Sequence, residues 1–280
     1  MKTILLPFHD EDAAVFALRG AALMARRFGS YVEGLFVAET AHLQIGGVVP
    51  VPAEYLSDYT RQWRERADKT RTRFCQAARE NGLTLGEMES EEQGPIAGWR
   101  EIEGDEATVI GEYGRLFDII AVGRSRLASS RWRETCEAAL FESGRPVLVV
   151  ADDPPSTIGD VVAIAWNGST ESARTIALAK PLLLAASTVI VVTVEGGMVG
   201  GPSGRDVAAH MQRNGIAAHA VSIQPGSSST GEAFIGEAVH LGADLLLKGA
   251  YTRSRLRQYM FGGATEHVLR NAPVPVLMAH

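Results

Sequence analysis

The stretch "DIIAVG", Asp118 to Gly123, returns later in the chain as "DLLLKG", Asp244 to Gly249. Each copy begins at an aspartate, continues as an apolar run and ends at a glycine, and the two copies lie 126 positions apart. Similarity at a spacing of this length indicates that one structural unit occurs twice. The chain of 280 residues has room for two units, because domains cluster near roughly 100 to 150 residues.

Other runs rich in valine and isoleucine alternate with helix-length segments in both halves. They are "TILLPF" (3–8), "YVEGLFV" (31–37) and "RPVLVV" (145–150), then "DVVAIAW" (160–166), "STVIVVTV" (187–194) and "VPVLMA" (274–279). Continuous apolar strands separated by helices predict a parallel sheet that is buried on both faces. The predicted class is α/β, with five strands and about four helices in each half.

The first half is the longer one. Near its start the offset between the copies rises to 158, the separation of Ile4 and Val162, so about thirty residues are inserted before Asp118. The insertion, at about 40–80, reads as a loop followed by a long amphipathic helix over 56–81. Consecutive prolines predict a linker over 151–159. The predicted domains are 1–151 and 158–280.

One segment of the first half places Trp99 between acidic residues. Residues 94–107, "GPIAGWREIEGDEA", are interpreted as a surface feature near the ligand-binding edge of the first sheet. Trp99 within this segment is expected to pack against the inserted helix instead of stacking on a ligand, because tryptophan is usually largely buried.

The composition excludes several classes of function. A net charge of -6 disfavours binding to nucleic acid or to an anionic membrane surface. No segment approaches the roughly 20 apolar residues of a membrane span, and the first residues lack a signal-peptide pattern, so a cytoplasmic location is expected. Cys75 and Cys136 form no CxxC pair and the seven histidines are scattered, so neither a disulfide framework nor a metal site is predicted.

Both halves resemble domains of the universal stress protein family, and the second half is the closer match. The resemblance rests on "VVAIAWNGSTESAR" (161–174), "ADLLLKGAYTRSRL" (243–256) and "FGGATEHVLRNAPVPVLMAH" (261–280). It implies two tandem doubly wound, Rossmann-like sheets of the adenine nucleotide alpha hydrolase-like type, each with strand order 3-2-1-4-5. It also implies a ligand between strands 1 and 4, where the order of an open α/β sheet reverses.

The family's ATP-binding members carry a glycine loop, which is Gly, two residues, Gly, nine residues, Gly, and then Ser or Thr. In this chain Gly249 and Gly262 fill the first and third positions. Thr252 replaces the second glycine and Gly263 replaces the hydroxyl residue. The resemblance therefore implies a phosphate loop that is only partly retained in the second half.

The residues of this loop suit a phosphate on chemical grounds. A helix that begins near Ala264 offers unpaired backbone N–H groups at its positive end. Arg253, Arg255 and Arg257 could reach phosphate oxygens, and Thr265 could partly replace the hydroxyl that is missing at Gly263. The alternative interpretation is that the glycines only shape a tight connection and that the arginines face solvent.

The end of the second half's first strand, "AWNGS" (165–169), is predicted to contact the adenosine part. Asn167 stands where many family members have an aspartate, and Thr193 and Val194 would flank the base. A cap for the following helix, made by Asn167 or Ser169, is the alternative. The residues expected at the nucleotide are Ala165, Trp166, Asn167, Thr193, Val194, Gly249, Thr252, Arg253, Gly262, Gly263, Ala264 and Thr265.

The first half departs further from the family pattern. Only Gly123 of the four loop positions is kept, and Arg126, Cys136 and Glu137 take the others. A bulky arginine and an acidic residue would crowd or repel a triphosphate, and His9 stands where the aspartate turn would be. No ATP is expected in this half.

The sequence predicts a binding protein and not an enzyme, since no general base beside a nucleophile is evident. The predicted function is a stress-response module whose second domain can hold ATP or another adenine nucleotide, with or without Mg²⁺. A nucleotide-free scaffold with two vestigial loops is the alternative. An unnamed protein partner, a pairing of the last strands near Val147 and Val276 as an internal pseudo-dimer, and a homodimer are further expectations.

Overall fold

A computed structural model of the chain describes all residues except 10–11, 39–52, 91–93, 125–129, 153–154 and 252–262. The first half contains β1 (Thr3–Pro7), α1 (Asp12–Phe28), β2 (Tyr31–Ala38), α2 (Ala53–Glu80), β3 (Thr84–Leu85), β4 (Ile96–Glu103), α3 (Glu106–Tyr113), a short 3-10 turn (Gly114–Leu116), β5 (Ile119–Gly123), α4 (Ser130–Glu142) and β6 (Val147–Val150). The second half contains β7 (Val161–Ala165), α5 (Thr170–Leu178), α6 (Lys180–Ala185), β8 (Thr188–Val194), α7 (Gly204–Arg213), β9 (Ala218–Ile223), α8 (Thr230–His240), β10 (Leu245–Gly249), α9 (Ala264–Asn271) and β11 (Val276–Ala279).

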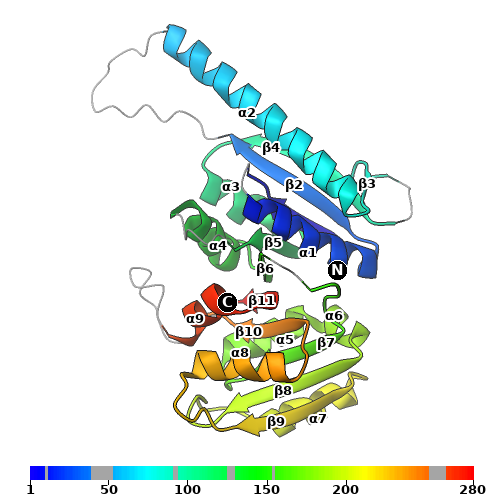
Figure 1. The fold of residues 1–280 in the computed structure, drawn as a ribbon, viewed down its shortest axis with the longest axis vertical. Coiled ribbons are helices and arrows are strands. Elements are labelled where there is room, and N and C mark those ends of the chain that lie inside the picture. The colour runs from blue at the N-terminus through cyan, green and yellow to red at the C-terminus, as the bar shows by residue number, and fades with distance from the viewer. Residues whose placement is uncertain (10–11, 39–52, 91–93, 125–129, 153–154, 252–262) are drawn as a thin grey trace.

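The strands of the described residues form one sheet in the order β3-β4-β2-β1-β5-β6-β11-β10-β7-β8-β9. The two halves follow one another along it, with the first half above the second in Figure 1. Within each half the neighbours are parallel, and the predicted order 3-2-1-4-5 is present as β4-β2-β1-β5-β6 and as β9-β8-β7-β10-β11. The first half adds the short edge strand β3, which was not predicted.

The two predicted sheets are in fact one continuous sheet. At the centre β6 and β11 pair in antiparallel register, with Leu148 opposite Leu277 and Val149 opposite Val276. This confirms the predicted pairing of the last strands. Each of these strands covers the unpaired backbone edge of the other, and such edges otherwise attract strands of other molecules.

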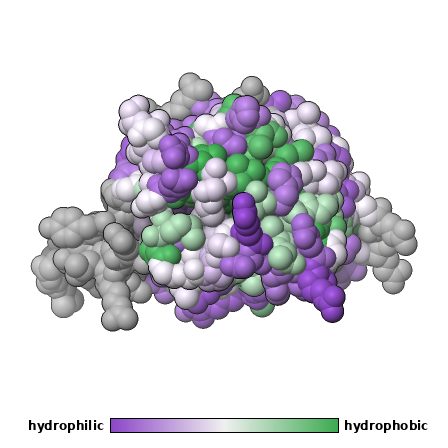
Figure 2. Space-filling view, turned by 90° about the horizontal axis from the view of Figure 1, so that it is seen from below, coloured by the Kyte–Doolittle hydropathy of each residue, from purple (hydrophilic) through white to green (hydrophobic). Residues whose placement is uncertain are grey.

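Helices cover both faces of the sheet. Helices α1, α2, α6 and α7 contribute to one apolar cluster, and α3, α4, α8 and α9 contribute to the other. Strand side chains alternate between the two clusters, which explains why the central strands are mostly apolar on both faces. Figure 2 looks onto the end of the molecule formed by β9, α7 and α8 in Figure 1, where apolar and hydrophilic surface are interspersed. Among the described residues, no helix is both long and apolar enough to cross a membrane.

The inserted helix lies where the sequence predicted it. Helix α2 ends at Glu80, just before Gly82, whose φ of 74° suits a glycine. Residues 96–103, which we interpreted as part of a surface feature, are instead strand β4. The interpretation was wrong because only the first residues of this strand are fully buried. Trp99 does pack against α2, with its ring centroid 5.2 Å from that of Phe74, as predicted.

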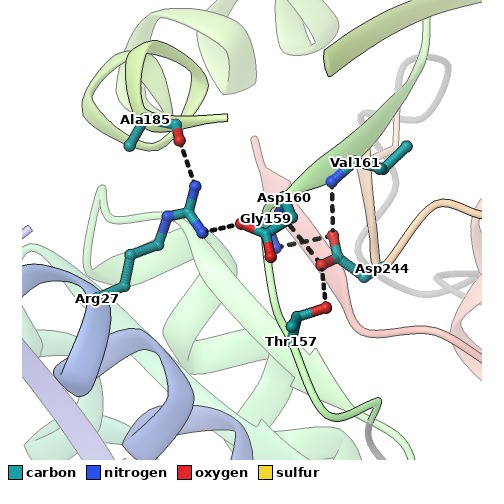
Figure 3. A network of polar contacts seen from close by, with 7 residues as sticks. All are labelled: Arg27, Thr157, Gly159, Asp160, Val161, Ala185 and Asp244. Carbon is teal, nitrogen blue, oxygen red and sulfur yellow. Dashed lines mark hydrogen bonds and ion pairs between the residues drawn. The ribbon is translucent and has the colours of Figure 1, made fainter. Parts of the chain in front are cut away.

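The repeated aspartates of the two copies make equivalent hydrogen bonds to the backbone. The carboxylate of Asp244 accepts hydrogen bonds from the backbone N–H groups of Gly159 (2.9 Å), Asp160 (3.1 Å) and Val161 (3.1 Å) and from the hydroxyl of Thr157 (2.7 Å). Figure 3 shows this network at the start of β7. The carboxylate of Asp118 likewise accepts from the N–H groups of Lys2 (2.5 Å) and Thr3 (3.2 Å), before and at the start of β1. Each aspartate ties the start of strand 4 to the start of strand 1.

Arg27 joins the two halves beside this network. Its guanidinium, at the end of α1, donates hydrogen bonds to the carboxylate of Asp160 and to the carbonyl oxygen of Ala185 (Figure 3). Asp160 belongs to the connection that leads into β7. The link between the halves therefore includes a charged contact outside the sheet as well as the β6–β11 pair.

Candidate functional site

The second half brings several predicted nucleotide residues to the carboxyl ends of its strands. Trp166 and Asn167 follow β7, Thr193 and Val194 end β8, and Gly249 ends β10. Ala165 is the buried last residue of β7. Gly263, Ala264 and Thr265 form the start of α9. The predicted residues Thr252, Arg253 and Gly262 lie outside the described residues.

Asn167 and Ser169 form the amino-terminal turn of α5. The side-chain oxygen of Asn167 accepts hydrogen bonds from the hydroxyl of Ser172 (2.6 Å) and from the backbone N–H of Ser169 (3.2 Å). The hydroxyl of Ser169 accepts from the backbone N–H of Ser172 (3.2 Å) and is the N-cap. The capping interpretation is therefore confirmed for Ser169, and Asn167 supports the same turn.

Thr193 and Val194 do not present their side chains to one ligand surface. The methyl group of Thr193 lies beside Gly204 of α7, whereas Val194 is buried in the apolar cluster under α8 and α9. Successive strand residues point to opposite faces. The two residues could flank a base through their backbone at the end of β8, but not through both side chains.

Gly249 is required by packing, whatever binds at the loop. A Cβ atom at this position would lie 2.5 Å from the backbone nitrogen of Ser172 and 2.8 Å from the carbonyl carbon of Glu171. Its repeat counterpart Gly123 is in the same situation, because its Cβ would lie 1.7 Å from the carbonyl oxygen of Ala13. At both positions the first helix of the half approaches strand 4 so closely that a side chain does not fit.

Gly263 sets the start of α9. Its φ of 77° and ψ of -155° lie in a region that only glycine enters readily, and α9 has no side-chain hydrogen bond at its N-cap. The first-turn N–H groups of a helix have no partner within the helix. The end of α9 nearest the loop thus keeps its partial positive charge.

Lys248, which we did not predict, lies directly beneath this helix end. Its side chain is buried, with 7% of the residue exposed, and its ammonium donates to the hydroxyl of Thr265 (2.9 Å) and to the carbonyl oxygen of Gly249 (3.0 Å). No carboxylate of the described residues pairs with it, and burial lowers its pKa to about 8. The repeat could have revealed this residue, because the first copy has Val122 at the same position.

The contact with Lys248 changes what we expected of Thr265. This threonine is 6% exposed, and its oxygen already accepts a hydrogen bond from the ammonium. Its hydroxyl hydrogen is still available, since an alcohol both donates and accepts. Thr265 therefore links the buried lysine to the first turn of α9.

In the first half, described side chains fill the region that corresponds to the predicted nucleotide site of the second half. The ring of His9 lies 3.0 Å from a carboxylate oxygen of Glu106, and the hydroxyl of Thr135 donates to the same oxygen at 2.6 Å. Beside them, among the described residues, a void of about 30 Å³ remains next to Trp132 and Gly123. That space suits a water molecule and not a nucleotide. The predicted Arg126 lies outside the described residues.

The carboxylate of Glu33, also in the first half, is buried and has a hydrogen-bond donor at each of its oxygens. It is 2% exposed and accepts hydrogen bonds from the hydroxyls of Tyr31 (2.8 Å) and Tyr113 (2.7 Å). The guanidinium of Arg100 lies 3.7 Å away. Burial and the neighbouring carboxylate raise the pKa of both tyrosines, that of Tyr113 to about 12. We interpret this group as a structural network between β2 and α3.

Comparison with known proteins agrees with this fold. The model of the universal stress protein family matches residues 205–280. A universal stress protein from Archaeoglobus fulgidus DSM 4304 is 18% identical, covers 99% of this chain and 95% of that chain, and superposes with a TM-score of 0.73. A functionally unknown protein from Pseudomonas aeruginosa PAO1, also 18% identical, covers 100% of this chain and 92% of that chain with a TM-score of 0.54.

Two further results complete the comparison. A universal stress protein in complex with cAMP is 15% identical and covers 54% of this chain and 98% of that chain, with a TM-score of 0.39. Its ligand is a property of that protein. No curated protein sequence matches this chain. Residues 205–280 therefore match the model of the universal stress protein family, and the whole chain has the fold of a tandem universal stress protein.

Proposed function

We propose that the second half binds ATP or another adenine nucleotide at the ends of β7 and β10, and that the protein acts as a stress-response binding module. The observation that carries this proposal is the unpaired charge of Lys248. A buried ammonium without a carboxylate partner costs several kcal/mol. The start of α9 lies at the same point and adds positive potential.

An anion at this point would stabilise both the buried ammonium of Lys248 and the positive start of α9. It would pair with the ammonium of Lys248 and accept hydrogen bonds from the first turn of α9. A phosphate group fits this description, and the family match over 205–280 favours a nucleotide as its carrier. The nucleoside would then extend toward Asn167, because ligands of open α/β sheets bind at the point where the strand order reverses.

Magnesium, if present, would come with the nucleotide. Within the described part of the chain, no group of three or more His, Cys, Asp or Glu residues could hold a metal ion. Mg²⁺ commonly binds through substrate phosphates and keeps several waters. The described groups of the site are a lysine, an amide, a threonine and backbone N–H groups, which can hold a phosphate. The ammonium of Lys248 is directed to Thr265 and Gly249, and no described carboxylate or imidazole stands beside it to act as a partner in proton transfer. We therefore propose binding without efficient catalysis, in the cytoplasm.

Replacing Lys248 by methionine tests the proposal. We expect the variant to bind ATP at least about tenfold more weakly than the wild-type chain in calorimetric titration with and without Mg²⁺, because one charge-assisted contact is worth about 1.5–3 kcal/mol. The wild-type chain should show one site. Lys69→Met, the same change on the first half's inserted helix, is the matched control and should bind like the wild type.

The same variant should be more stable than the wild type. We expect Lys248→Met to raise the free energy of unfolding at pH 7 by about 1–3 kcal/mol, because it removes an unpaired buried charge. The folded-state pKa of about 8 lies below the ordinary 10.5, so the unfolded chain binds more protons between these values. The wild type should therefore gain stability as pH rises from about 8 to 10.5, and the variant should not. Denaturant unfolding across this pH range measures both effects.

A nucleotide-free scaffold is the second candidate, and the packing of Gly249 favours it. This glycine is needed even if no ligand exists, since its Cβ would collide with the backbone of α5. Absence of ATP binding by the wild-type chain up to millimolar concentration would support the scaffold and overturn the nucleotide proposal.

A further inference from the structure

A second pocket lies on the other face of the second half, between α5 and α7. It encloses about 480 Å³, with Trp166, Met211 and Ile216 at its base and Ala177 and Val207 along its walls. Trp166 and Met211 belong to the apolar cluster on this face, whereas Val268 and Leu269 of α9 belong to the other cluster. The pocket therefore lies on the opposite face of the sheet from α9, and the side chain of Trp166, which we expected at the nucleotide, lies in this pocket instead.

The internal repeat explains why this pocket is open. At the offset of 158, Trp166 corresponds to Phe8 of the first half. Phe8 is completely covered there, and the rings of Phe74 on α2 and Trp99 on β4 lie 5.3 Å and 6.2 Å from its own. Trp166 is also buried, at 3% exposed, but α7 carries no Phe, Tyr or Trp to fill the space beside it. Helix α7 is only 10 residues long, against 28 for α2. It brings the smaller Val207 to the pocket, so the space remains.

The indole of Trp166 makes an apolar wall. Its N–H donates to the carbonyl oxygen of Pro202 at 2.9 Å, so its polar atom is occupied and its orientation is held. Ala173 and Ala177 of α5 line the same pocket with single methyl groups and are exposed to solvent. Contact with the body of an apolar ligand would remove this surface from water, which is favourable.

Lys180 places a positive charge at the rim of the pocket. The ammonium of Lys180 is held 3.0 Å from the side-chain oxygen of Asn214, and it pairs with no carboxylate of the described residues. The carboxylate of Asp206, also at the rim, accepts hydrogen bonds from the N–H (3.0 Å) and the hydroxyl (2.7 Å) of Ser203. These bonds lower the pKa of Asp206 and occupy it in the capping box of α7.

We propose that this pocket binds a small molecule with an apolar body and a single carboxylate, of the size of a medium-chain fatty acid. The volume lies within the range of small-molecule sites, roughly 300–1,000 Å³. The apolar body lies against the exposed Ala173 and Ala177 of α5, with the buried Trp166 beneath them, and the carboxylate pairs with Lys180.

Fluorescence titration with the probe 8-anilinonaphthalene-1-sulfonate, which has an apolar body and an anionic head, tests the cavity. We expect saturable binding at one site per chain and displacement by decanoate. Ala177→Phe should weaken probe binding at least tenfold by filling the pocket. Ala209→Phe is the matched control, because Ala209 is exposed on α7 but does not line the pocket. Near-unchanged binding by Ala177→Phe, or no saturable binding by the wild type, overturns the proposal.

A pair of ligands tests the charge. Lys180→Met should weaken decanoate binding about five- to tenfold, the effect of one charge-assisted contact at a partly exposed site, and should change decanol binding less than twofold. Equal effects on both ligands would overturn the role of Lys180. Circular dichroism of each variant checks that it is folded. Displacement of the probe by ATP instead of decanoate would show an anion site and would also contradict the proposal.

Discussion

Asp244→Ala is expected to lower the free energy of unfolding by about 3–5 kcal/mol, a large part of the stability of an ordinary domain. The substitution removes the acceptor of four hydrogen bonds at the start of β7. The buried N–H of Gly159 and the partly buried N–H of Val161 would lose their acceptor, and a fully buried group left in this state costs about 1–3 kcal/mol. Asp160, which Arg27 of the first half contacts, would lose its backbone anchor as well.

Chemical denaturation of both variants and of the wild type measures this effect. Asp118→Ala is the matched change in the first half, where the carboxylate accepts two backbone hydrogen bonds, and it should cost less. Asp244→Asn should fall between the wild type and the alanine variant, because one oxygen remains for Gly159 and Val161 while the amide faces the N–H of Asp160. A loss below about 1 kcal/mol for Asp244→Ala would contradict the proposed role.

Gly123→Ala is expected to destabilise the first half by about 3 kcal/mol or more, the scale of a severe packing clash. The added Cβ would lie 1.7 Å from the carbonyl oxygen of Ala13, so α1 would have to move away from β5. The φ of Gly123 is not positive, and the cost therefore comes from space alone. Thermal unfolding would report it as a lower midpoint.

Gly236→Ala is the control for this prediction. Gly236 lies within α8 and has open space where a Cβ would stand, so alanine should be neutral or slightly stabilising there. Similar midpoints for the two variants would show that the close approach of α1 does not matter. Gly249→Ala should resemble Gly123→Ala, with or without nucleotide, because the atoms it meets belong to α5.

The sequence alone determined the class of fold and its internal repeat. Apolar runs that alternate with helical segments predicted a parallel sheet, and the paired copies at Asp118 and Asp244 predicted two units. The amphipathic pattern before Gly82 predicted the inserted helix, which is α2. These features depend on local periodicity and on similarity between segments, and both can be read from a linear chain. Strand β4 was not predicted because none of the residues in its second half is buried, so its pattern resembles a surface segment.

Only the tertiary structure decided what individual residues do. The glycine pattern suggested that Gly249 serves a phosphate, yet the contact that requires it is with α5, 77 residues earlier at Ser172. The sequence analysis gave no role to the lysine in "DLLLKG", and only the fold buries its ammonium beneath α9 without a carboxylate partner among the described residues. Burial and unpaired charge are properties of segments that meet in space, so they depend on how distant parts of the chain pack against one another.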